Sequence, residues 1–456
     1  LFSNRSENTE RAHINKTFQR HLQFKKRLYK ITSPFGINTE EIFRMQTFCC
    51  TCSMNNIIKR HPLKLLLEFC LIGKVKSYKM YTLILQITLA ARSTNTRPCF
   101  HTLPQSLLNN KAANEAGVKF GIWIEPEMVN PKSELYEKHV DWVIKQPNRT
   151  EIYYRNQMVL DLSNPEVQDF VFGVVDNLMA NYPEISYMKW DDNCSLLDYG
   201  SSYLPKNKQS HLYIEYNRGL QKVLQRIRAK YPELVMQLCA GGGARVNYGL
   251  LPYFDEFWTS DDTDALQRIY MQWGVSGFFP AIAMASHVSA DKNHQTGRRI
   301  PLKFRFDVAM SGRLGMEIQP KDMNDVDKAF AKRAIAAYKD IRPVVQFGDL
   351  YRLVSPYDNK GVSSLMYVTS EKNKAVFYAY KISHFINMVI PKVCMNGLDP
   401  SKNYRLVDLT PVDSSKPCDL NGKIISGKIL MEEGIALKSL LKSEYSSLAL
   451  QLQAVD

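Results

Sequence analysis

Short apolar runs alternate with longer amphipathic stretches from Val118 onward, and each run ends in polar or charged residues. Runs of this length and composition predict β-strands, while the stretches between them have the length and spacing of helices. The six predicted strands cover residues 119–124, 185–190, 234–239, 257–260, 278–283 and 308–314. Their nearly continuous apolar character is typical of a sheet that is covered on both faces.

Helices are predicted between these strands, at residues 166–181, 213–230 and 263–273. Asn164 followed by Pro165 is a typical helix start, because the asparagine side chain caps free amides and proline fits the first turn. Thr263 and Asp264 can cap the third helix in the same way. Strands that alternate with helices at this spacing indicate parallel strands joined by helical crossovers.

The pattern changes after residue 345, where apolar runs become shorter and are separated by turn residues. Residues 365–369, 375–381, 387–390 and 429–431 are the runs in question. Asn396-Gly397, Asn421-Gly422 and Glu433-Gly434 are dipeptides that favour tight turns. We therefore expect three regions: an irregular extension at 1–110, an α/β region with parallel strands at 111–345, and a small antiparallel β-domain at 346–456.

The positive charge of the chain is concentrated in residues 1–110, which hold 17 Lys+Arg, 5 Glu and no Asp. These basic residues are scattered among apolar runs without a recognisable nucleic-acid motif, so we expect no nucleic-acid partner. The apolar run 80–91 resembles the core of a signal peptide but lies inside the chain, and no run reaches the ~20 residues that span a bilayer. We therefore expect no membrane association and assign no compartment.

Cysteine usage indicates neither a disulfide framework nor a metal site. There are nine cysteines, and five of them lie in the basic extension. The cluster at 49–52 lacks a second pair of ligands at the spacing of a zinc site. We therefore assign no metal.

Distinctive polar clusters follow four of the predicted strands. Glu125 follows the first strand, Asp191 the second, Ala240 to Arg245 the third, and Asp261 the fourth. In a parallel α/β barrel the reacting groups lie at the carboxyl ends of the strands. The four clusters are therefore expected to meet at one end of the sheet.

Asp191 is the candidate nucleophile. Alternate side chains of a strand share a face, so Lys189, Asp191 and Asn193 point together while Trp190 and Asp192 point away. A lysine beside Asp191 favours its ionised form, which suits attack on the anomeric carbon of a sugar. A structural ion pair at the end of a strand is the alternative.

Asp261 is the candidate acid/base, since it follows an apolar run that can raise the pKa of a carboxyl group. Two carboxyl groups with opposite tuning are what glycosidic cleavage requires. The alternative is that Asp261, Asp262 and Asp264 only cap the next helix.

The turn from Cys239 through Gly241 and Gly242 can bring backbone amides close to a ligand, because glycine has no side chain. It lacks the Lys-Ser/Thr continuation of a nucleotide loop, so amide donors to sugar hydroxyls fit better. Trp123 is a candidate sugar-stacking wall or a core residue, and Arg155 a candidate hydroxyl ligand or a surface residue.

Five motifs in order resemble those of the α-galactosidases of glycoside hydrolase family 36. The five motifs are Phe120-Gly121-Ile122-Trp123-Ile124-Glu125-Pro126-Glu127, Arg155-Asn156-Gln157, Lys189-Trp190-Asp191-Asp192-Asn193, Cys239-Ala240-Gly241-Gly242-Gly243-Ala244-Arg245 and Trp258-Thr259-Ser260-Asp261. The resemblance covers residues 111–345 and extends more loosely to the C-terminus.

The resemblance implies a (β/α)₈ TIM-type barrel that hydrolyses terminal α-galactosides of the melibiose and raffinose type with retention. It implies Asp191 as nucleophile and Asp261 as acid/base, with a galactose pocket formed by Trp123, Arg155, Lys189, Asn193, Cys239 and Gly242. It implies no cofactor, and it leaves linkage preference and homo-oligomerisation open.

The chain departs from the family pattern in two places. Asp192 stands where the family often has an apolar residue. Residues 1–110 contain no Asp-Asp-Gly-Trp-Phe motif and no recognisable β-sandwich, so the barrel is expected to be incomplete, with six of eight strands. A truncated, inactive relative and an α-N-acetylgalactosaminidase therefore remain alternatives, although the turn at Cys239 resembles the galactose-selective form.

Overall fold

The computed structural model describes the backbone of Thr82–Leu85, together with residue 115 and residues 117–455 except 359, 385–388 and 391. The expectation of an irregular extension at residues 1–110 lies outside the described residues, apart from that one strand. The domain limits at 110 and 345 stay predictions.

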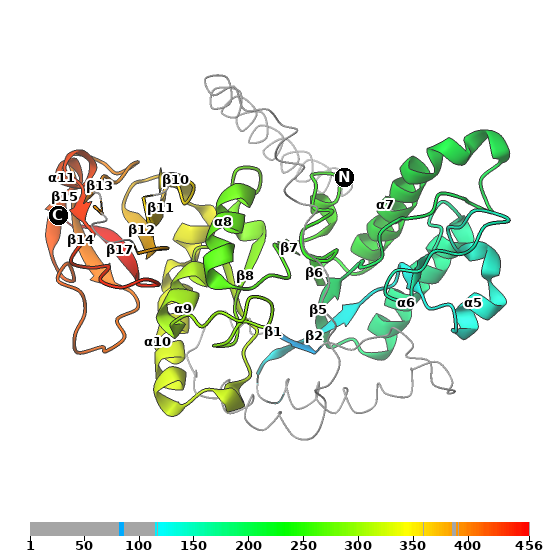
Figure 1. The fold of residues 1–456 in the computed structure, drawn as a ribbon, viewed down its shortest axis with the longest axis horizontal. Helices are drawn as coiled ribbons and strands as arrows, with labels where there is room; N and C mark the ends of the chain where they lie inside the picture. The colour runs from blue at the N-terminus through cyan, green and yellow to red at the C-terminus, as the bar shows by residue number, and fades with distance from the viewer. Residues whose placement is uncertain are drawn as a thin grey trace, which may run out of the picture. The chain divides into compact units, whose positions relative to one another are not determined.

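A parallel sheet forms the first part of the described chain, and its strands follow one another in sequence order (Figure 1). Its strands are β1 (Thr82–Leu85), β2 (Lys119–Ile124), β5 (Ile185–Trp190), β6 (Val235–Leu238), β7 (Glu256–Trp258), β8 (Met284–Val288) and β9 (Arg313–Met316). Every neighbouring pair is parallel. Within the described residues no pairing joins β9 to β1, which confirms an incomplete barrel.

Helical crossovers connect the strands as expected. They are α6 (Pro165–Asn181), α7 (Leu212–Lys230), α8 (Ala265–Val275), α9 (Leu302–Met310) and, after β9, α10 (Asp325–Phe347). Asn164 caps α6 by accepting from the Glu166 amide, with Pro165 in the first turn. Asp264 caps α8 by accepting from two amides of its first turn. The sheet and the inner faces of α6 and α7 share one apolar core, so the crossovers cover the sheet.

Two predicted strands are placed wrongly and a further strand is present. Residues 278–283 form a turn and the short 3₁₀ helix η6 (Ala281–Ala283), and β8 begins only at Met284. Residues 308–310 belong to α9, so β9 begins at Arg313. The seventh strand, β1, lies within the run 80–91 that resembles a signal-peptide core, and it pairs with β2 in parallel.

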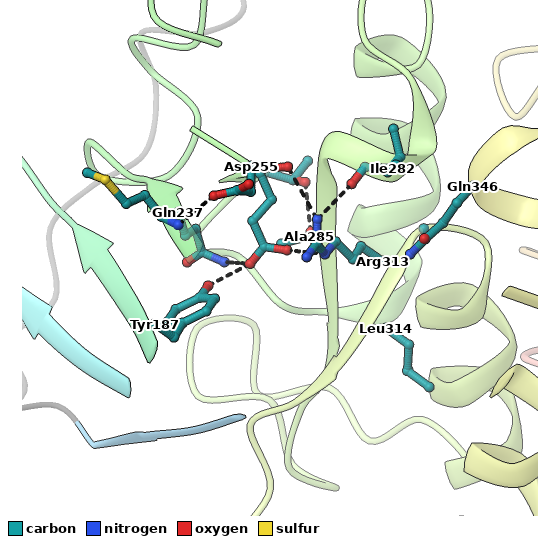
Figure 2. A network of polar contacts seen from close by, with 12 residues as sticks. Tyr187, Gln237, Asp255, Ile282, Ala285, Arg313, Leu314 and Gln346 are labelled. Carbon is teal, nitrogen blue, oxygen red and sulfur yellow. Dashed lines mark hydrogen bonds and ion pairs between the residues drawn. The ribbon is translucent and has the colours of Figure 1, made fainter. Parts of the chain in front are cut away.

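A polar network joins four strands of the sheet (Figure 2). Glu256 accepts hydrogen bonds from Tyr187 Oη at 2.5 Å and from Gln237 Nε2 at 2.7 Å, and its other oxygen lies 2.5 Å from Arg313 Nε. These four residues come from β5, β6, β7 and β9. Two positions after these residues come Lys189, Cys239, Trp258 and Gly315, respectively. Strand alternation therefore places these four side-chain positions on the same face of the sheet, one layer closer to the carboxyl ends.

A long connection between β2 and α6 carries two small strands and two short helices. These are β3 (Met128–Val129), α5 (Glu134–Lys138), η3 (Val140–Trp142) and β4 (Met158–Val159). β3 pairs with β4 in antiparallel fashion. Between η3 and β4, Tyr154 and Gln157 face each other across a two-residue turn formed by Arg155 and Asn156. The turn presents Arg155 beyond the end of β2.

The C-terminal part is an antiparallel β-domain, as predicted. Its main sheet has the order β10 (Asp349–Val354), β11 (Val362–Val368), β12 (Lys374–Lys381), β17 (Ser447–Val455), β14 (Asn403–Asp408) and β15 (Ile424–Ser426). A second sheet pairs β13 (Lys392–Val393) with β16 (Ile435–Ala436). The predicted strand at 429–431 is wrong, because these residues lie in helix α11 (Gly427–Glu432), which Ser426 caps. Of the predicted strand at 387–390, residues 389–390 are not a strand and the rest lies outside the described residues.

The β-domain packs on α9 and α10 through a shared apolar cluster and one buried carboxylate. Asp307 on α9 is fully buried and accepts from Thr410 Oγ1 and Ser447 Oγ at 2.6 Å each, and from Lys303 Nζ at 2.7 Å. The remaining short elements are η4 (Lys206–His211), η5 (Leu251–Tyr253) and η7 (Pro320–Asp322).

Candidate active site

The structure brings the predicted site residues together at the carboxyl ends of β2, β5, β6 and β7. Trp123 at the end of β2 donates from Nε1 to Asp191 Oδ2 at 2.9 Å. Asn193, two residues after Asp191, accepts from the Gly241 amide at 3.1 Å. Asp191 and Asp261 lie close enough to interact electrostatically. The four clusters therefore converge as the strand pattern predicts.

Asp191 occupies a buried, hydrogen-bonded position, and only 6% of the residue is exposed. Its Oδ1 accepts from the Asp192 amide at 3.0 Å, while Trp123 holds Oδ2. Burial opposes ionisation, but hydrogen bonding with Asn193 and the charge of Lys189 outweigh it and hold the pKa of Asp191 below its usual value. Asp191 is thus an ionised carboxylate with both oxygens oriented.

Lys189 interacts electrostatically with both aspartates. Its Nζ is 4.7 Å from the centre of the Trp258 ring, within the range of a cation–π contact. Burial lowers its pKa, but the negative charge of neighbours that include Asp191 and Asp261 raises it above the ordinary value overall. The lysine therefore stays charged.

Asp261 has the opposite tuning. Burial raises the pKa of its carboxyl above the usual value, and the Asp191 charge adds to this effect, whereas Lys189 opposes it. Its Oδ1 accepts from Trp258 Nε1 at 3.0 Å. Helix capping is carried by Asp264 instead, which is fully buried and accepts from the amides of Leu266 and Gln267. The capping alternative therefore applies to Asp264, and Asp261 does not cap the helix.

A second set of contacts surrounds Glu125, to which the sequence assigned no role. Its carboxylate accepts from Asn193 Nδ2 and, at 3.1 Å, from Gln157 Nε2. Arg155 Nη1 lies 3.6 Å away, and the Arg155 side chain is half exposed. Glu125 thus links the turn that carries Arg155 to the end of β5. Its position directly after a strand was the only signal in the sequence.

The turn after β6 packs tightly against the segment that carries Asp261. Gly242 has a φ of +97°, and a Cβ there would lie 3.0 Å from Ser260 Cα and 3.2 Å from the Asp261 amide nitrogen. A side chain at this position would therefore push the turn away from Asp261. Cys239 is 1% exposed and lies beside Lys189 and Asp191, so its thiol is part of the buried wall below the aspartates.

The side chains that the strand pattern directs away from this pocket form a separate buried cluster. Glu127 is fully buried and accepts from Trp190 Nε1 at 2.6 Å and from Arg245 Nη2 at 2.7 Å. Arg245 Nη1 also lies 3.0 Å from Asp192 Oδ2. Asp192 therefore faces Arg245 rather than the pocket, as the alternation of the strand predicts.

Neither a metal site nor a membrane span is found in the part of the chain that the structure describes. No group of three or more His, Cys, Asp or Glu side chains there is arranged to hold a metal ion. Among the same residues, no helix has the length and apolar character needed to cross a bilayer.

Comparisons with known proteins identify relatives of this chain in sequence and in fold. The chain matches the family model Melibiase over residues 99–348 and the model of the glycosyl hydrolase family 36 C-terminal domain over residues 362–452. It is 38% identical over 346 residues to the alpha-galactosidase AgaA of Geobacillus stearothermophilus, an alignment that covers 76% of this chain and 45% of that enzyme. The chain thus spans about half the length of the curated relatives that it matches.

Solved structures give the same result. The crystal structure of AgaA matches with a TM-score of 0.78 at 34% identity, over 86% of this chain and 53% of AgaA. A variant of AgaA in complex with raffinose matches with a TM-score of 0.77 at 34% identity, over the same shares of the two chains.

Proposed function

This chain belongs to the α-galactosidases of glycoside hydrolase family 36, and from that premise we propose that it hydrolyses terminal, non-reducing α-D-galactosyl residues with retention. The proposed substrates are galacto-oligosaccharides of the melibiose and raffinose type, since a relative of this fold holds raffinose. The observation that carries the proposal is the opposite tuning of two neighbouring carboxyl groups, with the pKa of Asp191 lowered and that of Asp261 raised.

In the first step, Asp261 donates its proton to the glycosidic oxygen while Asp191 attacks the anomeric carbon. The bond between that carbon and the oxygen breaks, the aglycone leaves as an alcohol, and an ester forms between galactose and Asp191. In the second step, Asp261 takes a proton from water, whose oxygen attacks the anomeric carbon. The ester breaks, galactose leaves with its original configuration, and Asp261 is protonated again.

The remaining site residues are proposed as the walls of the galactose pocket. The charge of Lys189 keeps Asp191 ionised, and Trp123 orients it through one hydrogen bond. Asn193 contacts both Glu125 and the Gly241 amide, so it ties the ends of three strands together. Arg155, Cys239 and Gly242 complete the proposed set of galactose-binding residues. The exposed guanidinium of Arg155 suits a ligand of sugar hydroxyls that closes the outer side of the pocket.

The proposed domains are the catalytic barrel at 111–345 and the β-domain at 346–456. The two family models that match the chain, which end at 348 and begin at 362, support this division.

Release of 4-nitrophenol from 4-nitrophenyl α-D-galactopyranoside tests the proposal, with Asp191→Ala as the control. We expect turnover by the unmodified chain and a loss of several orders of magnitude in the variant, since the nucleophile is removed. Proton NMR of the reaction is expected to show α-galactose as the first sugar released. Turnover no greater than that of Asp191→Ala, with both proteins folded by circular dichroism, would mean that this chain is an inactive relative. Preference for the N-acetyl-α-galactosaminide would instead support the alternative substrate.

A further inference from the structure

Trp258 lies at the end of β7, between the polar layer of the sheet and Asp261. The residue is only 2% exposed, so its ring cannot be a stacking surface for a sugar. Its indole Nε1 donates a hydrogen bond to Asp261 Oδ1, at 3.0 Å. The indole is therefore buried, and its N–H points to the proposed acid/base.

Three side chains fix the plane of the Trp258 ring. The His287 ring lies at a centroid distance of 4.4 Å with a tilt of 58°. Lys189 Nζ and Arg268 Cζ lie 4.7 and 5.3 Å from the ring centre. Both cations are positioned where they interact favourably with the π-face of an indole. Because the ring has contacts of this kind from several directions, its N–H has a fixed direction.

Arg268 also fixes the backbone between Trp258 and Asp261. Its Nη1 donates to the Ser260 carbonyl at 2.9 Å, and its Nη2 donates to the Ala285 carbonyl at 2.6 Å. The same Ala285 carbonyl accepts from Thr259 Oγ1 at 2.8 Å. The segment from Trp258 to Asp261 is thus tied to the Ala285 carbonyl of β8 both directly through Thr259 and indirectly through Arg268, which leaves little freedom for the carboxyl group.

The position of the His287 ring in turn requires a glycine at residue 315 of β9. Gly315 of β9 is the register partner of His287, and a Cβ on it would lie 2.3 Å from both Cδ2 and Nε2 of the His287 ring. The imidazole therefore occupies the space above Gly315. Burial, followed by the charges of Lys189 and Arg268, lowers its pKa to about 3. The ring stays neutral and adds no third cation beside the indole.

We propose that Trp258 is a positioning residue for Asp261, and that Gly315 and His287 support it by holding its ring in place. The single hydrogen bond to Oδ1 leaves Oδ2 as the oxygen that carries the proton to the glycosidic oxygen. This inference rests on the proposed function of Asp261. It predicts that a substitution on β9 changes the position of Asp261, because Gly315 contacts His287 of β8 and His287 contacts Trp258 of β7.

The first test replaces the donor and keeps the ring. Trp258→Phe retains an aromatic ring between His287 and Lys189 but has no N–H. A hydrogen bond to a carboxylate stabilises its ionised form, so its loss raises the pKa of Asp261. Lys189, Asp191, Arg155 and Glu317 also act on Asp261 and remain in the variant. We expect the alkaline limb of kcat/KM to move up by about one pH unit, with kcat reduced about tenfold and KM changed less than about threefold.

The second test acts from a distance. Gly315→Ala forces the His287 ring to move, and we expect a loss of kcat on the order of tenfold, because small displacements of a catalytic group are costly. In a His287→Ala background the same change is expected to cost nothing further, since the space is free. Gly173→Ala is the matched control, because an added Cβ there meets no atom within 4 Å.

A direct titration of Asp261 separates this inference from the proposed function. The carboxyl carbon of Asp261 is followed by ¹³C NMR in aspartate-labelled protein and assigned with Asp261→Asn. An upward shift of the Asp261 titration in Trp258→Phe supports the inference, whether or not the chain turns over substrate. An unshifted titration overturns it, even if the unmodified protein is an active α-galactosidase.

Discussion

Asp192 offers the sharpest prediction about stability, because its carboxyl group is buried next to a cation that it must share. Oδ2 lies 3.0 Å from Arg245 Nη1, but that guanidinium also makes two hydrogen bonds to Glu127. Among the described residues, Asp192 Oδ1 is buried without a hydrogen-bond partner. Burial raises the pKa of Asp192 from 3.8 to about 7, and the charges of Glu127 and Asp191 contribute while Arg245 opposes them.

The sign of the effect follows from the protons bound in each state. Between pH 3.8 and about 7, folded Asp192 holds a proton that the unfolded chain has released. The folded state therefore binds more protons, and its free energy of unfolding falls as the pH rises through this window. Each pKa unit corresponds to about 1.4 kcal/mol, so the full loss is about 4 kcal/mol, of which about 2–3 kcal/mol falls between pH 5 and pH 8.

Asp192→Asn removes the titration and keeps a carbonyl oxygen that Arg245 can contact. We expect the free energy of unfolding of the variant, minus that of the unmodified protein, to be about 2–3 kcal/mol larger at pH 8 than at pH 5, so the variant gains relative stability as the pH rises. Urea denaturation followed by circular dichroism at the two pH values measures this difference. Asp141→Asn, at an exposed position of η3, is the control and is expected to show no such difference. Equal effects of Asp192→Asn at pH 5 and pH 8 would refute the reasoning.

Three further predictions follow from other parts of the structure. The pKa of Asp191 is lowered and that of Asp261 raised, so kcat/KM is expected to fall in acid below the usual aspartate value and in base above it, and Asp261→Asn should abolish the alkaline limb of the measured profile. Arg155 and Asn156 both have positive φ, at 54° and 58°, so Asn156→Gly should stabilise the fold by about 0.5–1 kcal/mol and Asn156→Ala should destabilise it by a similar amount in thermal melts. Asp307→Ala leaves Lys303, Thr410 and Ser447 without their shared acceptor at the contact between α9 and the β-domain, and should cost about 3 kcal/mol or more in urea denaturation.

The sequence predicted β2, β5, β6 and β7 because each apolar run there stops at the first residue of the site. It misplaced β8 and β9 because a short apolar run does not distinguish a strand from other apolar segments, such as a buried helix. The last three residues of α9, at 308–310, are apolar and buried, so they join the residues that follow into one run and hide the start of β9. At residues 278–283, Phe278 is half exposed in a turn, while β8 contains polar Ser286 and His287.

The site was predicted as far as its residues form local motifs, and missed where its contacts join distant parts of the chain. Asp191, Asn193 and Asp261 each follow a strand within three residues, and strand alternation separated Asp191 from Asp192. Glu127 pairs with Arg245 over 118 residues, and Asn193 reaches Glu125 over 68. No local spacing indicates such pairs, since they depend on which loops the parallel sheet brings together. The same limit applies to Gly315. That this position must be glycine follows only from the structure, in which the His287 ring occupies the space of a side chain there.

Asp191 and Asp192 share a peptide bond, and the sheet gives their carboxyl groups opposite properties. Asp191 faces Lys189, Trp123 and Asn193, which together overcome the effect of burial and keep it ionised. Asp192 faces the guanidinium of Arg245, which Glu127 already occupies, and burial therefore keeps it protonated up to about neutral pH. Since the two side chains differ only in the face of the strand on which they lie, residue type cannot decide which of them reacts. A shift of one residue in the register of β5 would exchange their surroundings, so the parallel pairing of β5 with β2 and β6 is itself a requirement of the proposed chemistry.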